Sequence, residues 1–169
     1  AMVELFRLHG LDDERLNALR RRGNGYKKGF PLIPATYRRI FDNEVITIGD
    51  HKWKVTVGYG HAPEHASFYC KDLNVLISGD MLLPGISTNI PVKAANPRGN
   101  PLKDFLSSLR RYLDLPEDTL VLPSHGRPFT GIHLRVDQLE KHHKKRCEIL
   151  LDACFVPRTA CDILPALFE

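Results

Sequence analysis

Two histidines and one aspartate each follow an apolar, strand-like run of the sequence: His61, Asp80 and His125. Each comes directly after a small residue, glycine or serine. In layered α/β folds, residues at strand ends gather at a rim of the sheet, where ligands bind. Imidazole nitrogen and carboxylate oxygen are natural ligands for zinc or a similar divalent ion. The pattern therefore predicts a metal site made by these three side chains.

The strands that would position these residues are visible in the hydrophobic pattern. From Glu44 to Val57, apolar and polar residues alternate on either side of a Gly-Asp turn, which predicts a β-hairpin. Two further strand-like runs, at 66–70 and 74–78, are joined by a link that is too short for anything except a second hairpin. The sheet is therefore expected to be mostly antiparallel.

Helical patterns flank these strands. A first helix is expected near 12–22, and apolar residues at helical spacing predict a second at 102–113. A short strand is then expected at 119–122, followed by a charged helix at about 136–153. The alternation of strands and helices predicts an α/β fold in layers.

Read together, the three motifs resemble those of the metallo-beta-lactamase superfamily. The Gly-His turn at His61, which precedes a strand, resembles the third metal motif of that family. The run Val75–Asp80 resembles its strand that ends in a bridging aspartate, and Val121–Gly126 resembles its last histidine motif. The resemblance extends from Val45 to His143. It is closer to a subgroup of hydrolases than to the enzymes that destroy antibiotics.

The resemblance implies a role for each residue. His61 would bind a first divalent metal ion, His125 a second, and Asp80, the expected catalytic residue, would bridge the two. Zinc is the expected metal, and the ions would activate a water molecule that attacks an ester, thioester or lactone. His65 would not bind metal itself, because Pro63 prevents helical alignment of His65 with His61. It would instead hydrogen-bond to a metal ligand or to a carbonyl group. A histidine without any metal role is the alternative for His65.

The sequence departs from the family at its defining motif, two histidines one residue apart followed by an Asp-His pair. That motif occurs nowhere in this chain, and His9 and His51 are isolated. Since the motif belongs to the first half of the family's αββα sandwich, we interpret the chain as the C-terminal half of that fold, truncated and with an incomplete site. We expect it to be inactive alone, and to self-associate or bind the missing N-terminal half.

The resemblance also sets the expected domain boundaries. Residues 1–43 would form a helix and a basic loop that lead into the core, with the loop at 20–29. Residues 44–153 would form the C-terminal half of the fold. The tail at 154–169 has a short apolar pattern and is a candidate for the start of a winged-helix-like module, which follows the core in related members.

Composition sets limits on the function. The 169 residues are 43% hydrophobic, which is enough for one globular domain with a core. Lysine and arginine number 24 against 20 acidic residues, so the net charge of +4 permits nucleic acid but does not require it. We found no apolar run of membrane-spanning length and no signal peptide, and we expect a cytoplasmic protein with a small-molecule substrate. The four cysteines are expected to be reduced thiols.

Two other functions stay open at this point. Clustered cations at Arg20–Lys28 and Lys141–Arg146 suggest a nuclease of the same fold that acts on RNA or DNA. The other alternative is a catalytically inactive fragment whose open sheet face binds another chain. Salt-dependent RNA binding would favour the nuclease, and a stable dimer without metal would favour the fragment.

Overall fold

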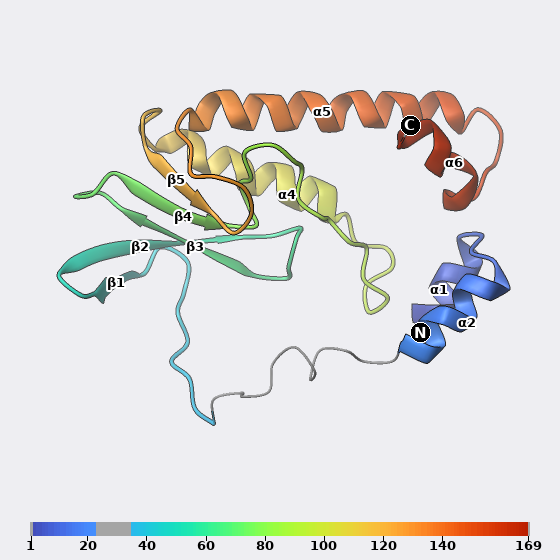
Figure 1. Cartoon of the computed structure of the whole chain (residues 1–169), viewed down its shortest axis with the longest axis horizontal. Helices are drawn as coiled ribbons and strands as arrows, with labels where there is room; N and C mark the ends of the chain where they lie inside the picture. Colours follow the sequence, from blue (N-terminus) through green and yellow to red (C-terminus); the bar gives the residue numbers. More distant parts are fainter. Residues whose placement is uncertain (1, 23–34, 169) are drawn as a thin grey trace. The chain divides into compact units, whose positions relative to one another are not determined.

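The structure is a computed structural model, in which residues 2–22 and 35–168 are described (Figure 1). The chain forms two compact units. The first, which we call the sheet unit, comprises residues 39–92 and 98–143. The second, which we call the helical unit, comprises the described residues of 1–38, 93–97 and 144–169.

A five-stranded sheet forms the centre of the sheet unit, with its strands in the order β1-β2-β3-β4-β5 (Figure 1). The strands are β1 (Val45–Ile48), β2 (His51–Gly58), β3 (His65–Cys70), β4 (Val75–Gly79) and β5 (Leu120–Pro123). The first four pair in antiparallel fashion, and β5 lies parallel to β4. The expected α/β fold with mostly antiparallel strands is confirmed.

The turns between the strands follow from residues that tolerate a left-handed backbone. Gly49 has a φ of +59° in the turn between β1 and β2, a conformation that glycine adopts without steric cost. Asn74, with a φ of +49°, ends the turn before β4. Its side-chain oxygen accepts a hydrogen bond of 2.7 Å from the Thr119 hydroxyl, and its carbonyl accepts one of 3.0 Å from Leu120. This turn therefore also aligns β5 beside β4.

Two helices pack on the sheet: α4 (Pro101–Arg110), which continues as the 3₁₀ helix η1 (Arg111–Asp114), and α5 (Ile132–Ala153). The Asn100 side chain caps α4 by accepting a 3.0 Å hydrogen bond from the Lys103 N–H. We expected α5 to begin at about residue 136. It begins earlier because Ile132 is fully buried against the core, so that the first helical turn contributes to packing.

The core lies between the sheet and these helices, and α4 and the first part of α5 cover the same face of the sheet (Figure 1). Each large apolar side chain that is fully buried contributes roughly 1.5–3 kcal/mol. The core residues come from β4, the loop after it, α4, η1, β5 and α5: Leu76, Met81, Leu82, Phe105, Leu109, Tyr112, Val121, Ile132, Val136 and Leu139. The loop after Asp80 is thus anchored by its own apolar residues.

Asp42 and Arg111 connect the segment before β1 to η1 and β2. Nη2 of Arg111 donates to both carboxylate oxygens of Asp42, at 2.9 and 3.0 Å. The Val57 N–H donates to the same carboxylate, and Nη1 of Arg111 donates to the Val57 carbonyl. Burial acts to raise the pKa of Asp42, but the hydrogen bonds from Val57 and Arg111 outweigh burial and hold the pKa below its usual value.

The helical unit joins segments from the two ends of the described chain. It contains α1 (Met2–Leu8), α2 (Asp13–Arg22), the end of α5, and α6 (Ala160–Leu167). The Cys161 N–H donates to the His9 carbonyl at 3.2 Å, and Arg146 donates to the Leu167 carbonyl at 2.7 Å. Helix α6 begins with a capping box of Thr159 and Asp162. No helix among the described residues is long and apolar enough to cross a membrane.

Several expectations for these ends can be compared with the structure. Asp12 caps α2 by accepting a 2.8 Å hydrogen bond from the Arg15 N–H, so the helix expected at 12–22 is confirmed. Helix α1 and the capping box of α6 were not anticipated. Of the basic loop expected at 20–29, the arginines at 20–22 end helix α2, and residues 23–29 lie outside the described residues.

A buried hydrogen bond connects η1 to the centre of the sheet. The Tyr112 hydroxyl and the Ser67 hydroxyl are 2.7 Å apart, and both residues are almost completely buried. Burial raises the pKa of Tyr112 to about 12, against smaller lowering effects of Ser67 and Arg111. Tyr112 is therefore neutral at physiological pH.

We expect Tyr112→Phe to lower the free energy of unfolding at pH 7 by about 1 kcal/mol, because the buried Ser67 hydroxyl loses a partner. Tyr112 ionises at a lower pH in the unfolded chain, near 10.0, than in the folded chain, so its contribution is present below pH 10 and is lost as the pH rises towards 12. The difference between native and variant protein should therefore shrink over that range. Urea unfolding measures it, with exposed Tyr37→Phe as control.

Candidate metal centre

The three residues predicted from the sequence lie at one rim of the sheet. Asp80 directly follows β4, and His125 lies two residues beyond the end of β5. Because β4 and β5 are parallel, their ends lie at the same rim. The end of β2 pairs with the start of β3 through Gly58 and His65, which brings the loop containing His61 to this rim as well.

Asp80 lies between the two histidines. Its Oδ2 is 3.3 Å from Nε2 of His61, and its Oδ1 is 3.4 Å from Nε2 of His125. The two oxygens of one carboxylate therefore face two different imidazoles. Within the described parts of the chain, no group of three or more His, Cys, Asp or Glu side chains is arranged around a single ion position. Two His–Asp pairs thus share one carboxylate.

Ser124 fixes the orientation of this carboxylate. Its hydroxyl donates a short hydrogen bond of 2.5 Å to Oδ1 of Asp80. Its backbone N–H donates to the carbonyl of Gly79 at 3.1 Å, which connects the end of β5 to the end of β4. We did not identify Ser124 as a site residue from the sequence. Its position directly before His125 is the signal that could have indicated it.

The hydrogen bonds of His61 determine which of its nitrogens is free to bind a metal. Nδ1 of His61 is 2.8 Å from the carbonyl oxygen of Asn89 and 3.2 Å from the hydroxyl of Thr88. A carbonyl oxygen only accepts, so Nδ1 is the donor in this contact, and in the neutral ring the lone pair is then on Nε2. That lone pair is on the nitrogen next to Asp80, as a metal ligand requires.

His65 supports Asp80 from behind. Its Nε2 accepts a 3.1 Å hydrogen bond from the backbone N–H of Asp80, so this nitrogen is not available as a ligand. Burial, and then the neighbouring His61, lower the pKa of His65, against the opposing effect of the Asp80 carboxylate. His65 is therefore neutral at pH 7, as its role of acceptor requires. Among the polar side-chain atoms of the described residues, its Nδ1 is buried without a hydrogen-bond partner.

Two glycines allow the close packing behind the site. Gly79 has a φ of +54°, and a Cβ atom there would clash with Cε1 of His65. Gly60 has a φ of +104°, and its Cβ would lie 2.5 Å from Cβ of Phe105 in α4. The imidazole of His65 and the helix α4 can therefore approach the backbone next to Asp80 and His61 only because these positions lack side chains.

The site is open on one side. The side chains of His61 and Asp80 are each 27% exposed, whereas that of His125 is 67% exposed. A hollow of about 330 Å³ lies beside His125 and is lined by Pro84, Gly85, Ile86 and Gly126 as well. The residues Pro84–Ile86 form one wall of this hollow, and His125 lies at its edge.

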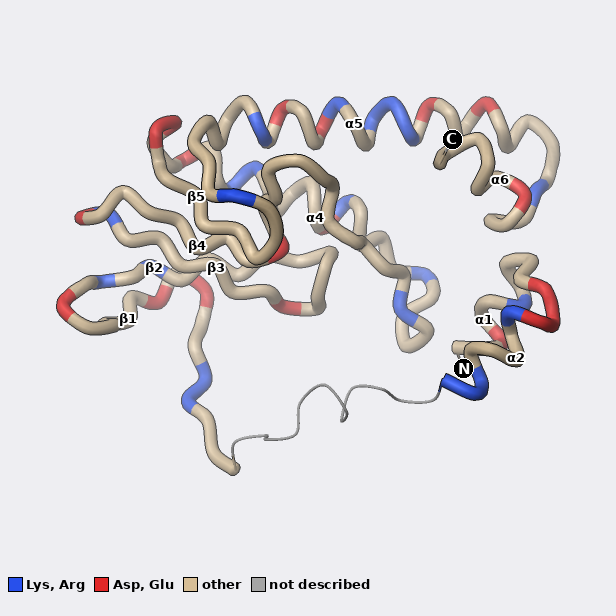
Figure 2. The backbone as a smooth tube through the Cα atoms, viewed as in Figure 1, with Lys and Arg blue, Asp and Glu red and all other residues tan. Residues whose placement is uncertain are grey.

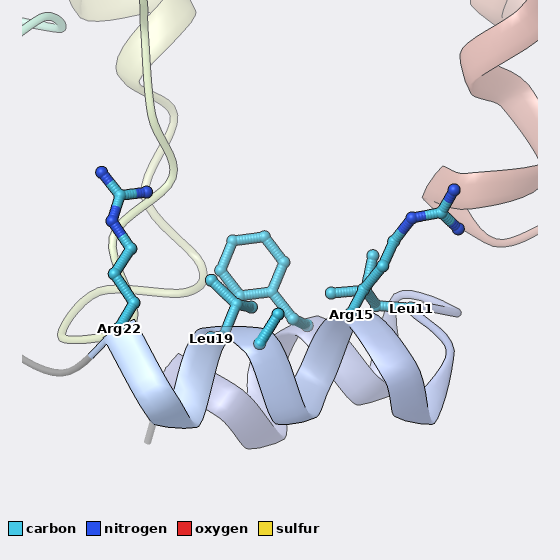
Figure 3. Close-up of a pocket in the computed structure, with 6 residues that line it drawn as sticks. Leu11, Arg15, Leu19 and Arg22 are labelled. Atoms are coloured by element: carbon cyan, nitrogen blue, oxygen red, sulfur yellow. The ribbon is translucent and has the colours of Figure 1, made fainter.

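Another hollow lies on the helical unit (Figure 3). Apolar residues of α1, α2 and the loop between them line it, and Arg15 and Arg22 extend at its two ends (Figure 3). The described residues that line this hollow include no His, Cys, Asp or Glu. It therefore lacks the groups that metal chemistry needs, and the candidate site is the rim of the sheet.

Ser87, in the loop after β4, and His143, in α5, were not identified as residues near the site by the sequence analysis. His143 is buried, and its Nε2 is 2.9 Å from the hydroxyl of Ser87. The stretch 84–101, which is rich in proline and glycine, supplies the partners of His61. Cys147 and Cys154 are exposed in the last part of α5 and the turn after it.

The chain is similar to proteins of one known superfamily. A family model described as the metallo-beta-lactamase superfamily matches residues 2–125. The chain belongs to the metallo-beta-lactamase superfamily. It is 32% identical over 123 residues to the probable metallo-hydrolase YqjP of Bacillus subtilis, a match that covers 69% of this chain and 37% of YqjP.

Two solved structures of the superfamily share the fold closely. A beta-lactamase domain protein from Burkholderia ambifaria has 44% sequence identity and a TM-score of 0.82, over 90% of this chain and 47% of that one. A metallo-beta-lactamase family protein from Thermus thermophilus has 33% identity and a TM-score of 0.80, over 98% and 52%. The chain thus spans about half the length of these structures, and about a third of YqjP.

Gly79→Ala tests whether the His65 imidazole supports the site. The alanine must adopt a left-handed backbone, which costs about 1–2 kcal/mol, and its Cβ would also displace the imidazole, which adds about 1–3 kcal/mol. Gly49→Ala is the matched control, because Gly49 has a similar φ but nothing within 4 Å of the Cβ position. Equal losses of unfolding free energy in the two variants would show that His65 does not pack against Gly79 as described.

Proposed function

We propose that this chain contributes half of the active site of a metal-dependent hydrolase that acts on an ester, thioester or lactone. His61 and His125 would each bind one of two divalent ions, with zinc as the expected metal, and Asp80 would bridge them. The observation that carries the proposal is the position of Asp80, whose two oxygens face the Nε2 atoms of two different histidines. A bridging carboxylate needs this arrangement.

The residues present fit such a pair of ions. When bound, the ions would polarise the scissile carbonyl group and lower the pKa of a water molecule. Asn89 keeps the proton of His61 on Nδ1, so that Nε2 is ready to bind. Ser124 and His65 hold Asp80 through its Oδ1 and its backbone N–H. These groups fix the ligands in advance, which reduces the cost of organising them when metal binds.

The hollow beside His125 supports an acyl substrate over a polyanionic one. Pro84, Gly85 and Ile86 form its wall, and none of these residues is charged. An apolar wall gains free energy from a hydrocarbon chain, at roughly 25 cal/mol for each Å² of apolar surface that is buried, and gains none from a phosphate. The substrate's acyl group would therefore lie along Pro84–Ile86, with its carbonyl group near Asp80.

The nuclease alternative has less support. Lys141 forms a 2.8 Å ion pair with Asp137, and Arg110 on α4 forms one of 2.7 Å with Glu140. Acidic residues lie before and after the basic residues at 141–146 of α5 (Figure 2), and Arg146 donates to the Leu167 carbonyl, so the basic stretch offered to a phosphate backbone is short. The cations of α5 are better explained as a solvated helix surface.

The remaining ligands would come from a second polypeptide segment that packs on the open face of the sheet. Val55, Phe68 and Ile77 are register partners across β2, β3 and β4 and therefore share one face. Ser67 points to Tyr112 in η1, so this apolar face is the one opposite the helices. On this face Ile77 is 37% exposed, whereas Val55 is fully buried, so the open part lies towards β4. We propose that the part of the longer relatives that lies outside the match covers this face, and a second copy of the chain is the competing occupant.

Zinc binding tests the roles of the three residues. We expect weak binding by the chain alone, because each ion has two protein ligands here instead of the usual three or more. Asp80→Asn should weaken zinc binding at both ions. The loss of affinity should exceed about tenfold, because mutating a residue that only hydrogen-bonds to a metal ligand already costs about that much. His61→Ala and His125→Ala should each affect one. Competition with a coloured chelator measures this, and exposed His9→Ala is the control. Unchanged binding by Asp80→Asn would refute the assignment.

Substrate preference tests the acyl hypothesis in a longer protein that contains this chain and a complete ligand set. It should hydrolyse acyl thioesters or lactones faster than phosphodiesters. Ile86→Asp should raise KM for a long-chain acyl thioester by about tenfold with little change in kcat, since about 1.4 kcal/mol of apolar contact is lost equally from ground and transition states. Leu73→Asp, in an exposed turn, is the matched control. Faster turnover of phosphodiesters would favour the nuclease instead.

A further inference from the structure

We propose that His143 and Ser87 form a positioning pair that holds His61 in the tautomer required of a ligand. The inference rests on the proposed function for its meaning, but its geometry and its test are independent of metal binding. His143 belongs to α5 and Ser87 to the loop after β4, so the pair connects two elements that are distant in the sequence.

The first connection runs through the loop. Nε2 of His143 is 2.9 Å from the Ser87 hydroxyl, and that hydroxyl is 3.4 Å from the carbonyl oxygen of Thr88. Thr88 and Asn89, the next two residues, supply the hydroxyl and the carbonyl that contact Nδ1 of His61. The short segment 87–89 thus has His143 at one end and His61 at the other.

The second connection runs through α4. The rings of His143 and Phe105 meet edge to face, with centroids 5.8 Å apart. Phe105 lies against the backbone of Gly60. A Cβ atom added at Gly60 would lie 2.5 Å from the Cβ of Phe105. Phe105 is fully buried and His143 is 9% exposed, so both are held by packing. His143 therefore supports both the partner of His61 and the turn that carries it.

The surroundings of His143 show why a histidine suits this position. It needs an apolar ring edge against Phe105 and a polar atom that reaches Ser87, and imidazole provides both. The adjacent His142 is exposed, although its ring lies 5.1 Å from that of His143. The contacts with Ser87 and Phe105 thus give His143 a specific structural role.

The tautomer of His61 is the direct readout. In protein with ¹⁵N-labelled histidine, at a pH where imidazole is neutral, NMR correlations of the ring nitrogens distinguish the Nδ1–H from the Nε2–H form. Native His61 should show the Nδ1–H form. Ser87→Ala and His143→Leu should shift the tautomer ratio by roughly two- to tenfold towards Nε2–H, the size expected when a hydrogen bond is lost. Neither change alters a proposed ligand.

Two variants provide the controls. His143→Gln retains a polar end near the position of Nε2 and should therefore keep the tautomer ratio of His61 closer to the native value than His143→Leu does. If His143 only filled space, the ratio in the Gln variant would depart from the native value more than the ratio in the Leu variant. His142→Ala should leave the ratio unchanged. If His143→Leu does not fold, Ser87→Ala decides the matter.

The inference is overturned if folded Ser87→Ala leaves the His61 tautomer at its native ratio. If the native chain binds no zinc although the tautomer responds to these changes, the positioning pair stands and the proposed metal function fails. The two claims can therefore be separated in the same set of proteins.

Discussion

The parallel pairing of β4 with β5 decides which residues can meet at the rim of the sheet. It places Asp80 and His125 at the same ends of neighbouring strands, and the Ser124 hydrogen bonds connect those ends directly. An antiparallel β5 would place His125 at the opposite rim, far from Asp80. The crossover that makes a parallel neighbour possible includes the loop after Asp80 and α4, and both contribute residues to the core. The site and the core are thus built from the same elements.

Much of this could be predicted from the sequence because the relevant signals are local. Alternation in the hairpins, glycines at strand ends and the spacing of apolar residues in α4 depend on neighbours a few residues apart. The three strand-end residues were identified for the same reason, and the order of their motifs indicated the family. Even the supporting role expected for His65 followed from Pro63, which excludes the helical alignment that chelation with His61 would need.

The parts that were missed depend on contacts between distant segments. Ser87 lies in a stretch without periodicity, and its partner His143 is more than fifty residues away in the chain. Helix α1 and α6 are short and are held together by contacts such as that between Cys161 and His9. The early start of α5 reflects the burial of Ile132, which local sequence does not reveal. Propensity and spacing carry no information about such long-range partners.

The proposed metal ligands among the described residues are held in place by hydrogen bonds, but they are too few to complete the coordination of two ions. Asp80 and His61 have their orientations fixed by Ser124, His65 and Asn89, although each proposed ion has two ligands in this chain. Such preorganisation is expected where a site is built on strand ends and supported by a layer of hydrogen bonds. The apolar sheet face opposite the helices provides a surface on which a segment with the other ligands can pack.

We propose that the Asp80 carboxylate bridges two metal ions. Crystals of the chain soaked in a zinc salt, with anomalous diffraction recorded at the zinc absorption edge, test it most directly. We expect two anomalous peaks on either side of the Asp80 carboxylate, one next to Nε2 of His61 and the other next to Nε2 of His125. A single peak held by other residues, or zinc bound through Nε2 of His65, would contradict it.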